Sequence, residues 1–86
     1  MSYQIKLHPT VSKFLDKCEV LLSERIKSKL KLLIEDPFRY LEPYEGNDYF
    51  KLRIGDYRAL IDVNKGRKII FIRYLNHRKK IYKETR

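Results

Sequence analysis

Three cations in the segment FKLRIGDYRALIDV, residues 50–63, have the types and spacing to bind a phosphate group. The segment has the pattern of two strands joined at a Gly-Asp dipeptide, and a two-residue hairpin loop with glycine first is favoured. This register would pair Arg53 directly with Arg58, and Lys51 would share their face because alternate strand residues point the same way. Like charges directly opposite each other are destabilising, whereas a bound phosphate would turn the repulsion into attraction. We therefore expect an anion site on one face of this hairpin, rather than three side chains that merely extend into water.

The distribution of charge supports an anionic partner. The chain of 86 residues has a formal net charge of +9. Residues 1–43 carry eight Lys/Arg and six Asp/Glu, whereas residues 44–86 carry twelve and five. A basic half-molecule favours nucleic acid, a membrane surface or an acidic protein as the partner. Of these, nucleic acid is the partner that we expect.

Other compositional features exclude several classes of site. The one cysteine, Cys18, cannot form an intrachain disulfide or a cysteine-rich metal site, and its spacing predicts a buried apolar thiol. No cluster of histidines or carboxylates has metal-ligand spacing, so we expect no metal and no cofactor. No apolar run approaches the roughly 20 residues that span a bilayer, and the first residues lack a signal-peptide core. The expected location is the cytoplasm.

The elements that would position these cations follow from hydrophobic periodicity. Residues 3–8 alternate as in a half-buried strand that ends at His8, which we interpret as structural. Pro9 suits the first position of a helix. A second helix carries apolar residues at helical spacing and should end at Asp36-Pro37. Residues 38–48 are expected to form a loop.

Three further strands are expected at residues 49–54, 57–63 and 68–75, followed by a tail at 76–86. The predicted order is β-α-α-β-β-β in a single α+β domain, residues 1–86. A helical hairpin would pack on one face of a small antiparallel sheet. That face should be the apolar side of the hairpin, so the cations would lie on the open face.

The register of the last strand decides which of its side chains, Arg73 among them, lie on the open face. A two-residue loop at Lys65-Gly66 would pair Arg73 with Arg58, whereas a three-residue loop would swap the faces of the strand. Leu60, and in one register Ile69 and Phe71, would leave an apolar patch on the open face, of the kind that often binds a partner.

The segments YFKLRIGDYRALIDV, KIIFIRYL and NHRKKIY together resemble the RelE/ParE superfamily of toxin–antitoxin systems, most of all RelE, a messenger-RNA endonuclease that acts in the ribosome. The resemblance covers essentially the whole chain and implies the RelE-like microbial RNase fold. It assigns catalysis to four positions: Lys51, Arg58, Arg78 and Tyr82. Tyr49 stands where RelE has a further lysine.

Residues near this set would bind the RNA: Arg53, Arg73, His77, Lys79 and Lys80. RNA can be cut without metal when the 2′-hydroxyl attacks the adjacent phosphate, and fixed cations stabilise the charge that accumulates there. His77 is the one candidate whose side chain ordinarily titrates near neutral pH, so it is either a proton donor or a surface contact.

The resemblance also implies partners and alternatives. A cognate antitoxin, RelB-like, acidic and partly disordered, would cover either the basic sheet or the helices, and messenger RNA and the ribosome would be the targets. One alternative is a ParE-like toxin that inhibits gyrase without cutting nucleic acid. The other is a non-catalytic module that binds RNA or the ribosome, which the absence of interleaved aromatic residues makes the weaker reading.

Overall fold

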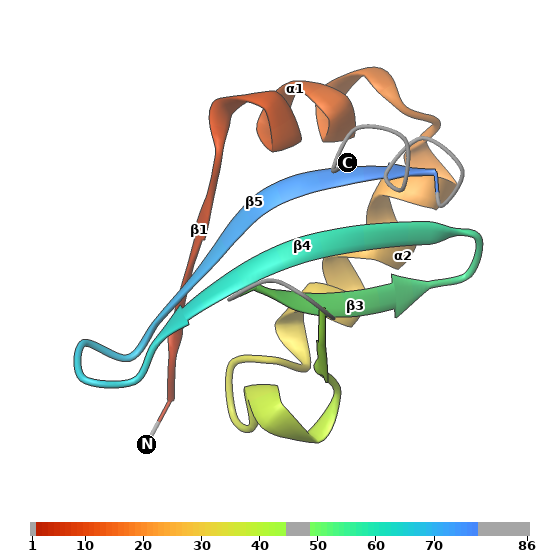
Figure 1. Ribbon diagram of the computed structural model, residues 1–86. Coiled ribbons are helices and arrows are strands. Elements are labelled where there is room, and N and C mark those ends of the chain that lie inside the picture. The colour runs from red at the N-terminus through yellow and green to blue at the C-terminus, as the bar shows by residue number, and fades with distance from the viewer. Residues whose placement is uncertain (1, 45–48, 78–86) are drawn as a thin grey trace.

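The computed structural model describes residues 2–44 and 49–77 (Figure 1). Its elements, in chain order, are β1 (Gln4–Leu7), α1 (Pro9–Lys17), α2 (Val20–Lys31), the 3₁₀ helix η1 (Pro37–Arg39), β2 (Glu42–Pro43), β3 (Phe50–Ile54), β4 (Tyr57–Asn64) and β5 (Ile69–His77). The helices lie on one side of the sheet and leave the other side open. The predicted β-α-α-β-β-β order is confirmed, with one short strand added between the helices and the hairpin.

The sheet has the strand order β1-β5-β4-β3-β2 and is mixed. Strands β3, β4 and β5 form the expected antiparallel meander, and β2 adds an antiparallel edge. The wholly antiparallel sheet of the prediction is wrong at β1, which pairs with β5 in parallel, Gln4 opposite Ile69. The alternation of apolar residues within β1 reports which face is buried but carries no information about the direction of its partner.

The ends of the helices are set by local hydrogen bonds. Helix α1 begins at Pro9, and the Nδ1 atom of His8 accepts a hydrogen bond of 3.1 Å from the backbone N–H of Thr10. The structural interpretation of His8 is therefore confirmed. Helix α2 ends at Lys31, earlier than predicted, and turns continue the chain to Pro37. Cys18 is half-buried at the end of α1 rather than buried, and its thiol donates to a backbone carbonyl there.

The core fills the space between the helices and the sheet, as the apolar face of the hairpin predicts. Leu52, Ile54 and Ile61 lie on this face and are buried. Leu60 faces the open side, yet it is only 5% exposed, so the expected apolar patch at this residue is wrong. Its cross-strand neighbours are Lys51 on β3 and Tyr74 on β5, and both flank it on the open face.

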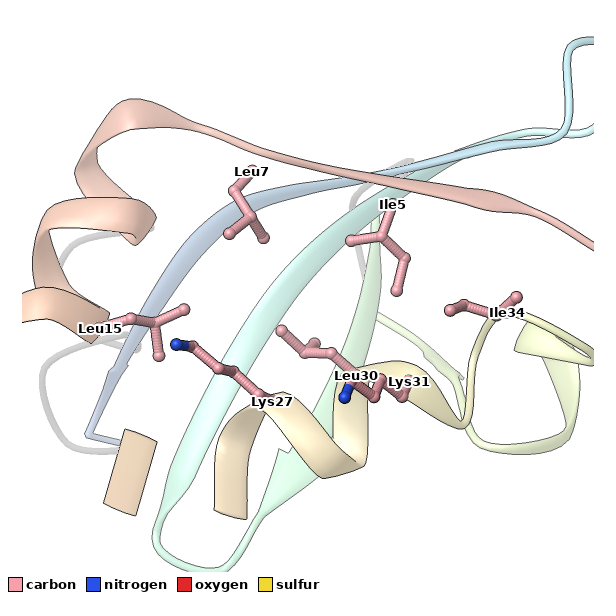
Figure 2. Close-up of a pocket in the computed structure, with 7 residues that line it drawn as sticks. All are labelled: Ile5, Leu7, Leu15, Lys27, Leu30, Lys31 and Ile34. Atoms are coloured by element: carbon pink, nitrogen blue, oxygen red, sulfur yellow. The ribbon is translucent and has the colours of Figure 1, made fainter. Parts of the chain in front are cut away.

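A groove lies between β1 and the two helices (Figure 2). It has a volume of about 300 Å³, and its lining is mostly apolar, with Ile5, Leu7 and Leu30 among the lining residues. Lys27 and Lys31 of α2 lie one helical turn apart on its rim. Leu7 is 36% exposed, so part of this apolar surface faces solvent. Over the described ranges, no helix is long and apolar enough to cross a membrane.

Candidate functional site

The hairpin of β3 and β4 has the register that the sequence predicts. Gly55 and Asp56 form the loop, and Arg53 lies directly opposite Arg58. Gly55 has a φ of +60°, a conformation that glycine adopts without the steric cost that a Cβ imposes. Positive φ at the first loop position is the requirement of a type II′ hairpin turn. Local turn chemistry therefore brings the two arginines together on the open face.

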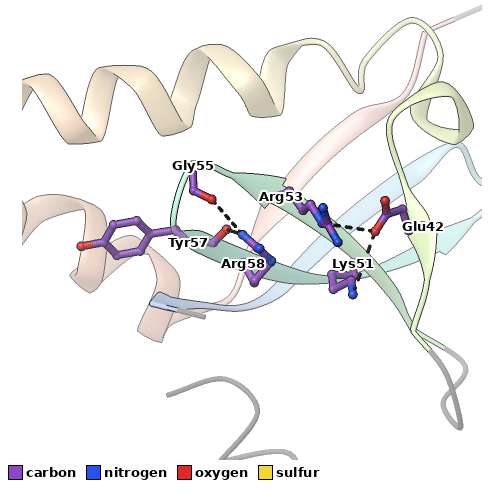
Figure 3. A network of polar contacts seen from close by, with 6 residues as sticks. All are labelled: Glu42, Lys51, Arg53, Gly55, Tyr57 and Arg58. Carbon is purple, nitrogen blue, oxygen red and sulfur yellow. Dashed lines mark hydrogen bonds and ion pairs between the residues drawn. The ribbon is translucent and has the colours of Figure 1, made fainter. Parts of the chain in front are cut away.

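Arg58 is fixed by backbone carbonyls. Its Nη1 atom donates hydrogen bonds of 2.9 Å to the carbonyl oxygen of Gly55 and 2.8 Å to that of Tyr57 (Figure 3). The side chain folds back over the turn and is only 8% exposed, and its Nε atom is buried without a hydrogen-bond partner in the described parts of the chain. Arg58 thus lies on the open face, as the hairpin register predicts, but it is largely buried there. The two hydrogen bonds explain this burial, because one carbonyl of the turn, Gly55, and one of β4, Tyr57, hold the guanidinium close to the backbone.

Lys51 and Arg53 converge on an acidic residue that the sequence analysis missed (Figure 3). The carboxylate of Glu42 lies 3.6 Å from Nε of Arg53 and 4.0 Å from Nζ of Lys51. The strand β2 brings Glu42 there, because Glu42 pairs with Lys51 across the sheet. Sequence periodicity gives no sign of so short a strand. Part of the positive charge of this face is thus balanced inside the protein.

Arg73 lies on the open face but does not pair with Arg58. The residue opposite Arg58 is Asn76, and the ladder of β4 and β5 shifts register between Leu60 and Ile61. This irregularity leaves Arg73 as the extra residue of β5, and a loop of four residues replaces the two-residue turn that the prediction assumed. The guanidinium of Arg73 instead forms an ion pair of 3.2 Å with Asp62.

Of the other candidate residues, the structure describes only His77. It lies opposite Tyr57 on the helix side of the sheet, with the two ring centroids 5.5 Å apart. The structure therefore does not bring His77 together with Lys51 and Arg58. Four candidates lie outside the described residues: Arg78, Lys79, Lys80 and Tyr82.

The open face can bind anions but shows no site for a metal. In residues 2–44 and 49–77, no group of three histidine, cysteine or carboxylate side chains could hold a metal ion. The guanidinium of Arg58 has no carboxylate within 4 Å among these residues, whereas Lys51, Arg53 and Arg73 each have one. A buried charge with carbonyl partners alone is costly, and an arriving anion would offset that cost.

The architecture is shared with solved toxin structures. A chain of the toxin–antitoxin complex RelBE2 from Mycobacterium tuberculosis superposes with a TM-score of 0.79 at 22% identity, covering 91% of this chain and all of that one. A chain of the archaeal RelE–RelB complex from Pyrococcus horikoshii OT3 gives 0.75 at 28% identity, with coverages of 91% and 97%. The isolated RelE toxin of E. coli gives 0.74 at 21% identity, with coverages of 96% and 94%. The fold is that of the RelE toxins.

Sequence comparison identifies the family. Residues 5–82 match the model of the ParE toxin of the type II toxin–antitoxin system parDE. The chain belongs to this family, and it is a type II toxin of the RelE/ParE superfamily, as the resemblance predicted. No curated protein matches the chain significantly. The match to a ParE model, beside structural neighbours that are RelE toxins, leaves two modes of action to be separated by experiment.

Proposed function

We propose that this toxin is a metal-independent endoribonuclease that cuts messenger RNA on the ribosome. Arg58 is the observation that carries the proposal. Its guanidinium is fixed in advance by two carbonyls on the open face and is not neutralised by a carboxylate in the described parts of the chain. A guanidinium is permanently charged, and with Nη1 held by the two carbonyls Arg58 would donate charge-assisted hydrogen bonds to a phosphate from Nη2. Such a preorganised donor stabilises charge that develops on a phosphate without reorganising during the reaction.

In the proposed reaction the 2′-hydroxyl of the RNA attacks the phosphorus of the next linkage. The bond between O2′ and phosphorus forms, the bond from phosphorus to the 5′-oxygen breaks, and a cyclic phosphate remains. The proton lost by the 2′-hydroxyl is balanced by the proton that the leaving 5′-oxygen gains. Arg58 would stabilise the phosphorane, and Lys51 and Arg53 would hold the adjoining phosphates once these displace Glu42. Roles for Arg78 and Tyr82 follow from the resemblance alone.

Induced expression with mapping of RNA ends tests the proposal. Wild-type protein should arrest growth and produce new RNA ends within translated messages, and Arg58→Ala should abolish both while circular dichroism shows a folded protein. Arg53→Ala is the matched control on the same face, because its side chain is 62% exposed and positions rather than reacts. The control should weaken cutting without abolishing it. Unchanged RNA ends in cells that express Arg58→Ala would refute the assignment.

A second candidate function has its own support. The matching family model describes ParE toxins, and Glu42 already balances two of the cations that cleavage would need. Both observations favour inhibition of DNA gyrase by binding, with no nucleic acid cut by the toxin. Intact messages, together with DNA-damage signals and inhibited supercoiling by purified gyrase, would identify this mode. The same expression experiment thus separates the two candidates.

The toxin would be neutralised by a cognate antitoxin, as the RelE–RelB complexes among its structural neighbours suggest. The groove of Figure 2 favours the helix side as the docking surface. Its apolar floor between Leu7 and Leu30, with Lys27 and Lys31 on the rim, fits an amphipathic segment that carries acidic residues. Complementary charge speeds the capture of such a segment. Occupation of this groove would leave the face of Arg58 uncovered, so a second contact or steric exclusion from the target would have to complete the neutralisation.

A further inference from the structure

A second hollow lies on the open face, near the turn between β4 and β5. It has a volume of about 200 Å³. Asp62 and Asn64 of β4 line one side, and their direct cross-strand partners, Phe71 and Ile69 of β5, line the other. Drug-sized ligands occupy pockets of about 300–1,000 Å³. This smaller hollow has room for a single planar ring system.

The register shift of β5 builds a stacking surface at this hollow. It releases Arg73 from the ladder, and the guanidinium then lies 5.0 Å from the centroid of the Phe71 ring and 5.7 Å from that of Tyr49. Asp62 holds the guanidinium from the side at 3.2 Å. A guanidinium plane supported by aromatic rings is a surface on which proteins stack unpaired RNA bases. This group could not be recognised from the sequence, because Tyr49 and Phe71 approach Arg73 only in the folded sheet.

The polar groups at the hollow favour particular bases. An ionised carboxylate such as that of Asp62 only accepts hydrogen bonds, and its remaining lone pairs can accept one from a base while Arg73 occupies the other side. Cytosine, adenine and guanine each carry an exocyclic amino group that can donate to such an acceptor. Uracil presents a carbonyl at the same place, which a carboxylate repels. The hollow therefore has the chemistry to prefer amino-bearing bases.

The position of the hollow relative to Arg58 fits one continuous strand of RNA. Both lie on the open face of β4, and Asp62 follows Arg58 by four residues, about 13 Å along the strand at 3.3 Å per residue. Stacked nucleotides are spaced about 3.4 Å apart along one strand, and an extended strand spans more. A base a few nucleotides from the phosphate at Arg58 would thus reach the hollow.

We propose that the hollow between Asp62, Phe71 and Arg73 is a base-binding subsite that selects amino-bearing bases over uracil near the cleavage position. This inference rests on the proposed function and names the feature of the RNA that the open face would read. The carboxylate supplies the selectivity, and the guanidinium supplies affinity that does not depend on the base.

Binding of short RNA that cannot be cut tests the subsite directly. Fluorescence anisotropy would measure the affinity of the full chain for 2′-O-methyl pentamers of cytidine and of uridine, which have rings of the same size. Wild type should bind the cytidine pentamer about tenfold more tightly, the range expected for one good hydrogen-bonded contact to a base. Asp62→Asn should remove the preference, and Arg73→Gln should weaken both complexes. The matched control is Asp16→Asn on α1, which makes the same charge change on the helix side and should retain the preference.

The outcomes distinguish this inference from the proposed function. Equal affinity of wild type for the two pentamers, or a preference that survives Asp62→Asn, would overturn the base subsite and leave RNA cleavage at Arg58 standing. Failure of wild type to bind either pentamer would also overturn the base subsite, whereas RNA cleavage on the ribosome is decided separately by the mapping of RNA ends. Because the pair of Asp62 and Arg73 is exposed, with 44% of each side chain accessible, its loss should not unfold the protein.

Discussion

Arg58 combines two properties that stability alone does not explain. Its guanidinium is buried, and its hydrogen-bond partners in the described chain are carbonyl oxygens with no full negative charge. Burying a charge without a counter-ion is unfavourable, and in the proposed complex the phosphate of the RNA would supply the missing charge. The cost should therefore be visible in the free energy of unfolding.

Replacing Arg58 by methionine should leave the free energy of unfolding unchanged within about 1 kcal/mol or raise it, because an apolar chain of similar length removes an uncompensated charge. The same substitution should abolish toxicity. Urea denaturation measures the stability, and Arg53→Met, whose side chain is mostly exposed, is the control that should change it little. A loss of more than about 2 kcal/mol in Arg58→Met would mean that the guanidinium acts as a structural clamp for the turn.

In the proposed complex, Glu42 would compete with RNA for Lys51 and Arg53. Glu42→Gln should tighten the binding of uncleavable RNA by up to about fivefold at low salt, since exposed ion pairs contribute about 0.2–1 kcal/mol. The gain should shrink as salt rises, because salt screens these charges. Anisotropy titrations at two salt concentrations measure it, with Glu24→Gln on α2 as the control. An equal gain in both variants would show that net charge, and not release of the two cations, is responsible.

The hairpin turn of β3 and β4 is the element that positions Arg58. Gly55→Ala should lower the free energy of unfolding by about 1–2 kcal/mol, because alanine pays a steric cost at a φ of +60°. A Cβ at this position would also lie 3.1 Å from the guanidinium of Arg25, which can move away. Since the carbonyl of Gly55 anchors Arg58, toxicity should fall as well.

Gly66→Ala is the matched control for that turn. Gly66 does not have a positive φ, and an added Cβ would make an ordinary contact of 3.5 Å with Asn64. Alanine should therefore be neutral or stabilise by up to about 1 kcal/mol, through the unfolded chain. Thermal or urea unfolding of both variants checks the pair. Equal effects at the two glycines would contradict the role assigned to the turn.

The elements also show what could be predicted from sequence and what could not. Alternation along β3 and β4, with a glycine at the turn, was sufficient to predict the pairing of Arg53 with Arg58 and the buried face of the hairpin. The register shift beside Leu60 escaped prediction, because β5 is apolar at most of its positions and the break in its alternation between Ile72 and Leu75 leaves no mark in the sequence. The strand that carries Glu42 is two residues long and has no period to detect. Burial of Arg58 depends on carbonyl directions that no residue pattern encodes.

For the molecule as a whole, the two sides of the sheet have different surfaces. The open side carries the cations and the hollow at Asp62, and the helix side carries the lysine-rimmed apolar groove. This separation allows the target and the antitoxin to be recognised by different residues. Substitutions in one surface should then leave the function of the other intact.

The double variant Lys27→Glu/Lys31→Glu tests this separation. It should remain toxic and should escape neutralisation by a co-expressed antitoxin, because reversed charge on the groove rim repels an acidic segment. Growth assays with and without the antitoxin measure both properties. Lys13→Glu/Lys17→Glu, one turn apart on α1, is the control that should still be neutralised. Neutralisation of both variants alike would move the docking surface away from the groove.

The parallel pairing of β1 with β5 has a consequence for folding during synthesis of the chain. Gln4 finds its partner only when Ile69 has been synthesised and has left the ribosome, so the sheet cannot be completed on a partial chain. Pairings so distant along the chain also slow folding. A newly made copy therefore passes through an interval in which its sheet, and with it the order of the strands that carry Arg53 and Arg58, is incomplete.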